Sequence, residues 1–192
     1  MILWSVYRAL FKTDLPLWFD ELIAKPLIFV LPVFLYVKKV EKKPFFGRIE
    51  LHFKNFWKEL AFGIFVGGLF AAVFIFFNKI SFTTKIIPFV FLALATAISE
   101  EALSRGFVLK RLYESWGSIL TSSFFASILF FFMRVPILFT SDKLTGSALL
   151  LTMALDIIFS MLVSIIFLVR KNITAPILIH AFYSLALYML FS

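Results

Sequence analysis

The chain has 192 residues, of which 62% are hydrophobic and only 16% are charged. Soluble domains average about half apolar and a quarter charged residues, so this composition excludes that class. The absence of cysteine excludes disulfides, thiolate metal sites and a cysteine nucleophile. Several apolar runs reach the roughly 20 residues that a helix needs to cross a bilayer. The sequence therefore predicts an all-α, polytopic transmembrane helix bundle that forms a single domain over residues 1–192.

Residues 1–21 are rich in Trp and Phe with interspersed charges, which predicts an amphipathic segment at the membrane interface. They show no basic start, apolar core and small-residue cleavage site in succession, so we expect no signal peptide. The first of about six predicted spans, residues 22–37, is the weakest, because Lys25, Pro26 and Pro32 interrupt it. The further predicted spans cover residues 60–77, 86–109, 118–135, 147–169 and 173–191.

The second predicted span carries Gly63 and Gly67, four residues apart, with Gly68 beside them. Small residues at this spacing share one face of a helix and let a neighbouring helix backbone approach closely. We therefore expect this face to pack tightly against another span, in a structural and not a chemical role.

The formal net charge of +8 is compatible with nucleic-acid binding as well as with a membrane surface. The positions of the charges distinguish these two kinds of partner. Eleven lysines and arginines lie within residues 38–59, at 110–111 and at 170–171, against three in the loops on the other side. The positive-inside rule then places residues 38–59, the basic loop, in the cytoplasm and both termini outside. We expect this loop to meet anionic headgroups of the lipid bilayer, and we expect no nucleic-acid partner.

Six ionisable residues within the spans stand out, because such groups are costly in hydrocarbon unless they are paired or functional. They are Glu100, Glu101, Arg105, Arg134, Asp156 and His180. Glu101 and Arg105 are four residues apart and can pair on one helix face. Glu100 points about 100° away and is expected to stay free, as a general base requires. Alternatively, Glu101 and Arg105 serve only to tie helices together.

Three stretches carry a resemblance to a known family. "SEEALSRGFVLKRL" resembles the EExxxR motif of the CPBP intramembrane proteases, which include type II CAAX prenyl proteases and Abi-like bacteriocin-processing or self-immunity proteins. "SSFFASILFFFMR" resembles the second motif, an aromatic followed four residues later by His. "VRKNITAPILIHAFYS" resembles the third, which ends in HxxxN. The order and spacing of the three agree over residues 86–192.

The resemblance implies an intramembrane endopeptidase in which Glu100 activates water, while Glu101 and Arg105 support the site. His180 would stabilise the developing oxyanion together with Ser184, which stands where the third motif has Asn. The implied substrate is a prenylated or otherwise membrane-associated peptide or protein. The implied location is a prokaryotic cytoplasmic membrane, with a site cavity open toward the cytoplasmic side.

The chain departs from the family pattern at Arg134, which stands where the second motif has His, and at Ser104, where an aromatic usually precedes the Arg. A guanidinium has no acceptor and does not deprotonate in proteins, so Arg134 cannot share a proton with Glu100. The alternative function is therefore a catalytically impaired relative that acts as a membrane scaffold or immunity-type binding protein. Buried Glu, Arg and His also build proton relays, which makes a small transporter a third interpretation.

Helical rise predicts which of these residues share a depth. Glu100 and His180 lie roughly 15 Å and 14 Å from the basic residues near the cytoplasmic ends of their helices, so they share a level. Arg134 and Asp156 lie deeper, at roughly 25 Å and 21 Å on the same scale. We therefore predict an interhelical salt bridge between Arg134 and Asp156, with a structural or modulating role.

The sequence favours glutamate catalysis without a metal. It contains no HExxH motif, and catalytic zinc commonly takes three protein ligands that include histidines. Glu100, Glu101 and His180 could just supply three ligands, but adjacent glutamates on one helix diverge. We therefore expect no cofactor, with zinc as the alternative.

Overall fold

The computed structural model describes residues 4, 6–7, 16–78, 86–140 and 146–191, and in these residues every regular element is a helix. One helix of 31 residues runs from α6 through a π-helical stretch into α7. Its parts are α6 (Ile86–Glu101), Ala102–Leu109 and α7 (Lys110–Trp116). The other long helices are α5 (Phe56–Asn78), α8 (Ile119–Thr140), α9 (Gly146–Arg170) and α10 (Thr174–Phe191). The predicted all-α class is confirmed for this part of the chain.

Residues 17–41 form a further continuous helix, called the first helix below. It alternates α-helical and π-helical stretches: α2 (Leu17–Phe19), Asp20–Ala24, Pro26–Val30, α3 (Leu31–Tyr36) and Val37–Glu41. The short α4 (Phe45–Arg48) and the 3-10 turn Phe53–Asn55 connect it to α5. Most of the predicted interfacial segment, residues 1–21, lies outside the described residues. Within that segment Trp4 is buried and packs edge-on against Phe29.

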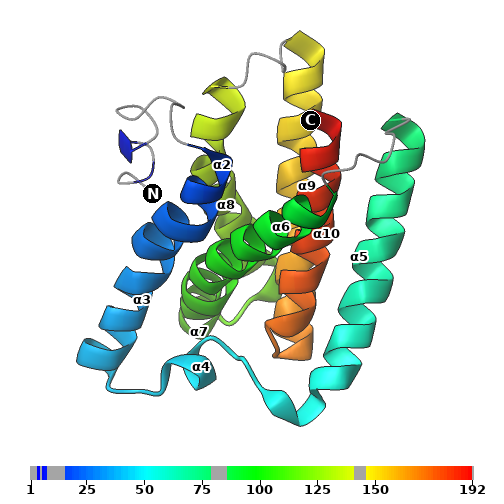
Figure 1. The fold of residues 1–192 in the computed structure, drawn as a ribbon. Coiled ribbons are helices and arrows are strands. Elements are labelled where there is room, and N and C mark those ends of the chain that lie inside the picture. Colours follow the sequence, from blue (N-terminus) through cyan, green and yellow to red (C-terminus); the bar gives the residue numbers. More distant parts are fainter. Residues whose placement is uncertain (1–3, 5, 8–15, 79–85, 141–145, 192) are drawn as a thin grey trace.

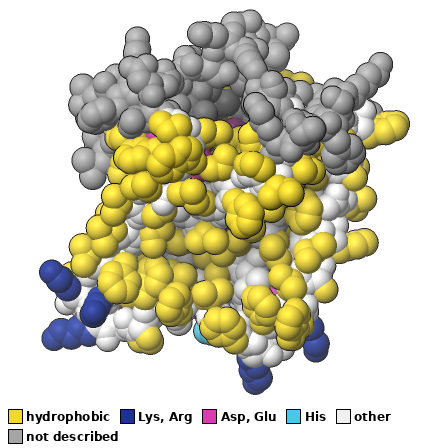
Figure 2. Space-filling model, viewed as in Figure 1, with side chains coloured by type: hydrophobic (Ala, Val, Ile, Leu, Met, Phe, Trp, Pro, Cys, Tyr) yellow, Lys and Arg dark blue, Asp and Glu magenta, His cyan; other side chains and the backbone are white. Residues whose placement is uncertain are grey.

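Within the described residues, three helices are long and apolar enough to cross a membrane: Phe53–Phe76, Ile86–Trp116 and Leu149–Arg170. Ile119–Met133 and Thr174–Met189 are shorter apolar helices. The face shown in Figure 2 is covered by hydrophobic side chains over most of its height, and its Lys and Arg side chains gather at the end that carries α4 and α7. Several long apolar helices with charge at one end are typical of a multi-pass membrane protein.

Helix α10 lies at the centre of the bundle (Figure 1). It packs against α5 and α6 along much of its length and against α9 more briefly, while α8 packs against α9. The first helix lies on the opposite side of the molecule from α5 and contacts α6 through its π-helical stretches. The two helices that carry the predicted glutamates and the predicted histidine, α6 and α10, are therefore direct neighbours.

The contact between α5 and α10 depends on two glycines, as their spacing predicted. A Cβ atom added to Gly63 would lie 2.8 Å from Cβ of Leu178, and one added to Gly67 would lie 3.0 Å from Cα of Ile179. Neither distance leaves room for a side chain without displacing α10. Gly68 faces open space, with nothing within 4 Å of an added Cβ.

The basic loop is anchored to the bundle at Arg48, which is buried. Its guanidinium donates to Glu41 at 2.9 Å and to the two carboxylate oxygens of Glu114 at 2.5 and 2.7 Å. The hydrogen bonds with Glu114 raise the pKa of Arg48 further above its usual range. The lysines of the loop, in contrast, are exposed: Lys38, Lys39, Lys42, Lys43, Lys54 and Lys58. These exposed lysines remain the ones predicted to meet lipid headgroups.

Replacing Gly63 by Ala is expected to lower the melting temperature of the detergent-solubilised protein, because overpacking of this kind costs about 1–3 kcal/mol. Gly68→Ala is the matched control, and its free space predicts an unchanged or slightly raised melting temperature. Equal effects of the two substitutions would contradict the close approach of α5 to α10.

Glu50 makes the anchoring of the basic loop dependent on pH. Burial alone would raise the pKa of the Glu50 carboxyl, but hydrogen bonds from Lys110 and His52 bring that pKa below its ordinary value. A lowered pKa means that the ionised group stabilises the fold at neutral pH and loses this effect as the pH falls through the folded-state pKa. Thermal unfolding measured from pH 7 to pH 3 should therefore show a smaller acid-induced loss in Glu50→Gln than in the unchanged protein. An identical pH profile for the two proteins would contradict this role.

Candidate active site

Glu100 and Glu101 are the last two residues of α6, and Arg105 lies in the π-helical stretch that follows. His180 lies in α10. All four residues are buried, with exposed fractions of 2%, 0%, 1% and 0% in this order. Two carboxylates, a guanidinium and an imidazole are thus enclosed among apolar helices, where each group needs a polar partner.

Glu101 holds both Arg105 and His180 through one oxygen. Its Oε1 accepts a hydrogen bond from Nη1 of Arg105 at 2.9 Å and lies 2.8 Å from Nδ1 of His180. The predicted pairing of Glu101 with Arg105 is therefore confirmed. Because a carboxylate can only accept, the proton between Glu101 and the ring lies on Nδ1, and Nε2 faces away from Glu101.

Arg105 is fixed from three helices. Its Nη2 donates to the carbonyl oxygen and the hydroxyl of Ser160 in α9, at 3.1 and 2.8 Å, and its guanidinium lies 4.4 Å from the ring centroid of Phe130 in α8. Nη1 also donates to the hydroxyl of Ser104, which in turn donates to the main-chain oxygen of Glu100 at 2.5 Å. The small residue at position 104 thus links the guanidinium to the helix turn that carries the glutamates.

Glu100 and His180 meet, as the depth argument predicted. Oε2 of Glu100 lies 3.6 Å from Nε2 of His180, so the two glutamates contact opposite nitrogens of one imidazole. The ring is held edge-on between Phe130 at 5.6 Å and Phe159 at 6.0 Å between centroids. The imidazole is therefore oriented by aromatic packing as well as by its bond to Glu101.

Glu100 is not free, which corrects the prediction from its position on the helix. The ammonium of Lys25 donates to Oε1 of Glu100 at 2.7 Å and lies 2.6 Å from Oε2 of Glu21. In the sequence analysis Lys25 only interrupts the first predicted span. The missed signal is the spacing of Glu21 and Lys25, which are four residues apart and pair on one face of the first helix. The sequence prediction placed Glu21 outside the span of residues 22–37, in the interfacial segment.

The polar contacts continue beyond Lys25. Oε2 of Glu21 accepts a hydrogen bond from the Thr96 hydroxyl at 2.5 Å, and the same hydroxyl lies 2.9 Å from the phenol oxygen of Tyr188. Thr96 belongs to α6 and Tyr188 to α10. We call the following set the buried charge cluster: Glu21, Lys25, Glu100, Glu101, Arg105 and His180.

Ser184 follows His180 by one turn of α10 and is buried, and its hydroxyl has no hydrogen-bond partner among the described residues. Asp156 is also buried and accepts a hydrogen bond from the phenol of Tyr183, which the sequence did not suggest. The side chain of Arg134 lies outside the part of the chain that the structure describes. The predicted salt bridge between Arg134 and Asp156 therefore stays a prediction.

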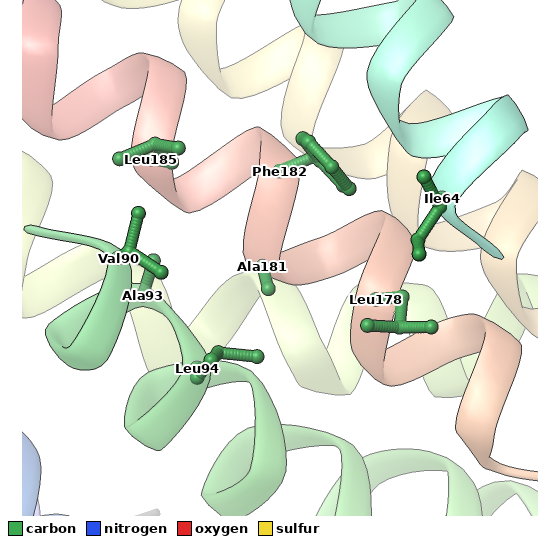
Figure 3. Close-up of a pocket in the computed structure, with 8 residues that line it drawn as sticks. All are labelled: Ile64, Val90, Ala93, Leu94, Leu178, Ala181, Phe182 and Leu185. Carbon is green, nitrogen blue, oxygen red and sulfur yellow. The ribbon is translucent and has the colours of Figure 1, made fainter. Parts of the chain in front are cut away.

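A separate apolar pocket of about 220 Å³ lies between α5, α6 and α10 (Figure 3). The pocket and the cluster use different faces of α10. Ala181 lines the pocket, whereas the preceding residue, His180, contacts the glutamates. The lining consists of Ile64, Val90, Ala93, Leu94, Leu178, Ala181, Phe182 and Leu185. Such a lining suits hydrocarbon and offers nothing to a polar group.

The cluster holds its charges by pairing. Over the described residues, no group of three or more His, Asp or Glu side chains is placed to hold a metal ion. Glu100 contacts Lys25, while Glu101 contacts Arg105 and His180. With His180 protonated, the six described side chains of the cluster carry three negative and three positive charges.

Comparison with known protein families gives a match over the region of the site. Residues 81–186, more than half of the chain, match the family described as Type II CAAX prenyl endopeptidase Rce1-like. No curated protein and no solved structure matches the chain. The matched region contains Glu100, Glu101, Arg105 and His180, and it leaves out Glu21 and Lys25.

Arg105→Met is expected to destabilise the protein by about 3–5 kcal/mol, because it removes the guanidinium partner of the buried Glu101 carboxylate. The double variant Arg105→Met/Glu101→Gln removes both charges and should recover part of this loss. Thermal unfolding in detergent measures both effects. Arg111→Met, which breaks a more exposed pair with Glu41, is the control with a smaller expected loss. Equal losses at Arg105 and Arg111 would contradict the buried pairing.

Proposed function

The chain belongs to the Rce1-like family of type II CAAX prenyl endopeptidases, and from this membership we propose that it cleaves peptide bonds within the membrane, with Glu100 as the base that activates water. The observation that carries this proposal is the approach of Glu100 Oε2 to His180 Nε2, at 3.6 Å inside the buried charge cluster. A water oxygen beside these two atoms would lie within hydrogen-bond reach of both, as general base catalysis requires.

In the proposed reaction, Oε2 of Glu100 takes a proton from water while the water oxygen attacks the carbonyl carbon of the scissile bond. Protonated His180 donates its Nδ1–H to Glu101 and its Nε2–H to the carbonyl oxygen, which becomes negative. Collapse of the tetrahedral intermediate breaks the carbon–nitrogen bond, and the proton held by Glu100 passes to the leaving amine. Glu101 and Arg105 act by orienting the imidazole and stabilising its charge.

Ser184 is the second donor that we propose for the oxyanion. It follows His180 by one helical turn, so both side chains lie on the same face of α10. Its buried hydroxyl has no partner among the described residues and can donate one hydrogen bond, as the amide of the family's Asn would.

We further propose that the six predicted spans all cross the membrane, with the basic loop in the cytoplasm and the entry to the site on that side. The first helix carries Glu21 and Lys25, which are tolerated in a span because Thr96 pairs with Glu21 and Glu100 pairs with Lys25.

The proposed substrate is a prenylated or otherwise membrane-associated peptide in a prokaryotic cytoplasmic membrane. The apolar pocket in Figure 3 can receive a hydrocarbon chain from such a substrate or from lipid. Because the cluster is buried, the peptide reaches it only when surrounding helices part.

A second candidate function is a membrane scaffold or immunity-type binding protein without proteolytic activity. Two observations favour it: Arg134 replaces the histidine of the second motif, and Lys25 already occupies one oxygen of Glu100. Such a protein would keep the fold and bind a substrate-like peptide without cleaving it.

The experiment uses purified protein in liposomes with a library of farnesylated CAAX peptides, and it compares the unchanged chain, Glu100→Gln and Arg134→His. We expect cleavage by the unchanged chain and a loss of at least about 100-fold in kcat for Glu100→Gln, since the base is removed without a change in shape. Glu114→Gln, remote from the cluster, is the matched control and should cleave normally. Cleavage by Arg134→His alone, or peptide binding without cleavage by every variant, would support the second candidate function.

A further inference from the structure

Lys25 is buried to an exposed fraction of 1%, which lysines almost never are unless they are paired. It comes from the first helix, outside the region that matches the protease family. Its ammonium contacts Glu100 at 2.7 Å and Glu21 at 2.6 Å, and it lies 5.7 Å from the ring centroid of Trp4. A lysine with two carboxylate partners and an aromatic neighbour is built into its position.

The placement of Lys25 is enforced from two other helices. Glu21, the second carboxylate that contacts the ammonium, accepts a hydrogen bond from Thr96 of α6. Thr96 in turn contacts Tyr188 of α10. The ammonium is therefore fixed relative to both helices that carry the proposed catalytic groups, and not only to its own helix.

The contact divides the two oxygens of Glu100 between two partners. Oε1 is taken by Lys25, and Oε2 faces Nε2 of His180. A carboxylate that acts as a base must be ionised and must present one oxygen to water, and an ionised group in an apolar interior needs a nearby opposite charge. We propose that Lys25 is a positioning residue of the reaction, which keeps Glu100 ionised and turns its Oε2 toward His180.

This inference rests on the proposed function, but one readout does not need activity. Infrared spectra of the protein in lipid distinguish an ionised carboxylate from a protonated carboxylic acid. Lys25→Met removes the cation and keeps an unbranched side chain of similar length. We expect this variant to gain the carbonyl band of a protonated carboxylic acid, and Lys25→Arg to retain the spectrum of the unchanged protein.

Two control variants assign that band. Lys25→Met/Glu21→Gln should keep it, and Lys25→Met/Glu100→Gln should lose it, if the proton lies on Glu100. Failure of the band to appear, or its survival without Glu100, would overturn the inference. Melting temperatures are measured for every variant, and Lys25→Gln replaces Lys25→Met if that variant does not fold.

Activity is the second arm of the test. With a cleaved farnesylated peptide, Lys25→Met should lower kcat roughly 10- to 100-fold with little change in KM, and Lys25→Arg should restore part of the rate. An unchanged kcat in Lys25→Met would overturn the positioning role, and a higher kcat would overturn it and identify an inhibitory contact instead. If the unchanged chain cleaves no peptide, the proposed function fails, while the infrared spectra still decide whether Lys25 keeps Glu100 ionised.

Discussion

Charged groups enclosed in an apolar bundle must find opposite charges inside it, and this constraint explains the centre of the molecule. Removing one partner from a buried pair leaves a charge that neither water nor lipid can solvate. The buried charge cluster meets the constraint by drawing its members from three helical segments: the first helix, the helix that begins as α6, and α10. The same contacts that neutralise the charges therefore also fix how these segments lie against one another.

The contacts within the cluster also orient the groups that the proposed reaction uses. Arg105 is bound by Ser104 and Ser160 and covered by Phe130, so the carboxylate of Glu101 has a fixed neighbour. Glu101 in turn orients His180. A site whose groups are already oriented loses little free energy to reorganisation when charge develops on the substrate. The outward-facing sides of the helices instead expose many large hydrophobic side chains.

Much of this arrangement could be predicted from the sequence, because it depends on local spacing. Apolar runs located the helices, four-residue spacing paired Glu101 with Arg105, and helical rise placed Glu100 level with His180. The contact of Lys25 with Glu100 joins residues 75 positions apart and depends on how the first helix is rotated, which no local pattern records.

The prediction that the adjacent side chains of Glu100 and Glu101 diverge was also wrong. Both side chains reach one imidazole, from two positions directly before the π-helical stretch Ala102–Leu109. In a regular α-helix, adjacent side chains leave the backbone in different directions. The length of the glutamate side chain and the position of α10 also decide where each carboxylate lies. Asp156 and Tyr183 likewise meet across two helices, and no spacing within either one indicates it.

The position of Lys25 has a consequence for how the chain can be divided. The region that matches the family, residues 81–186, holds Glu100, Glu101 and His180 but not Lys25, the cation that contacts Glu100. That region is therefore not a transferable module. In a chimera that joins this region to the first helix of a relative, Glu100 would lack the contact with Lys25. Chimeras of this chain must therefore exchange residues 17–41 together with residues 81–186.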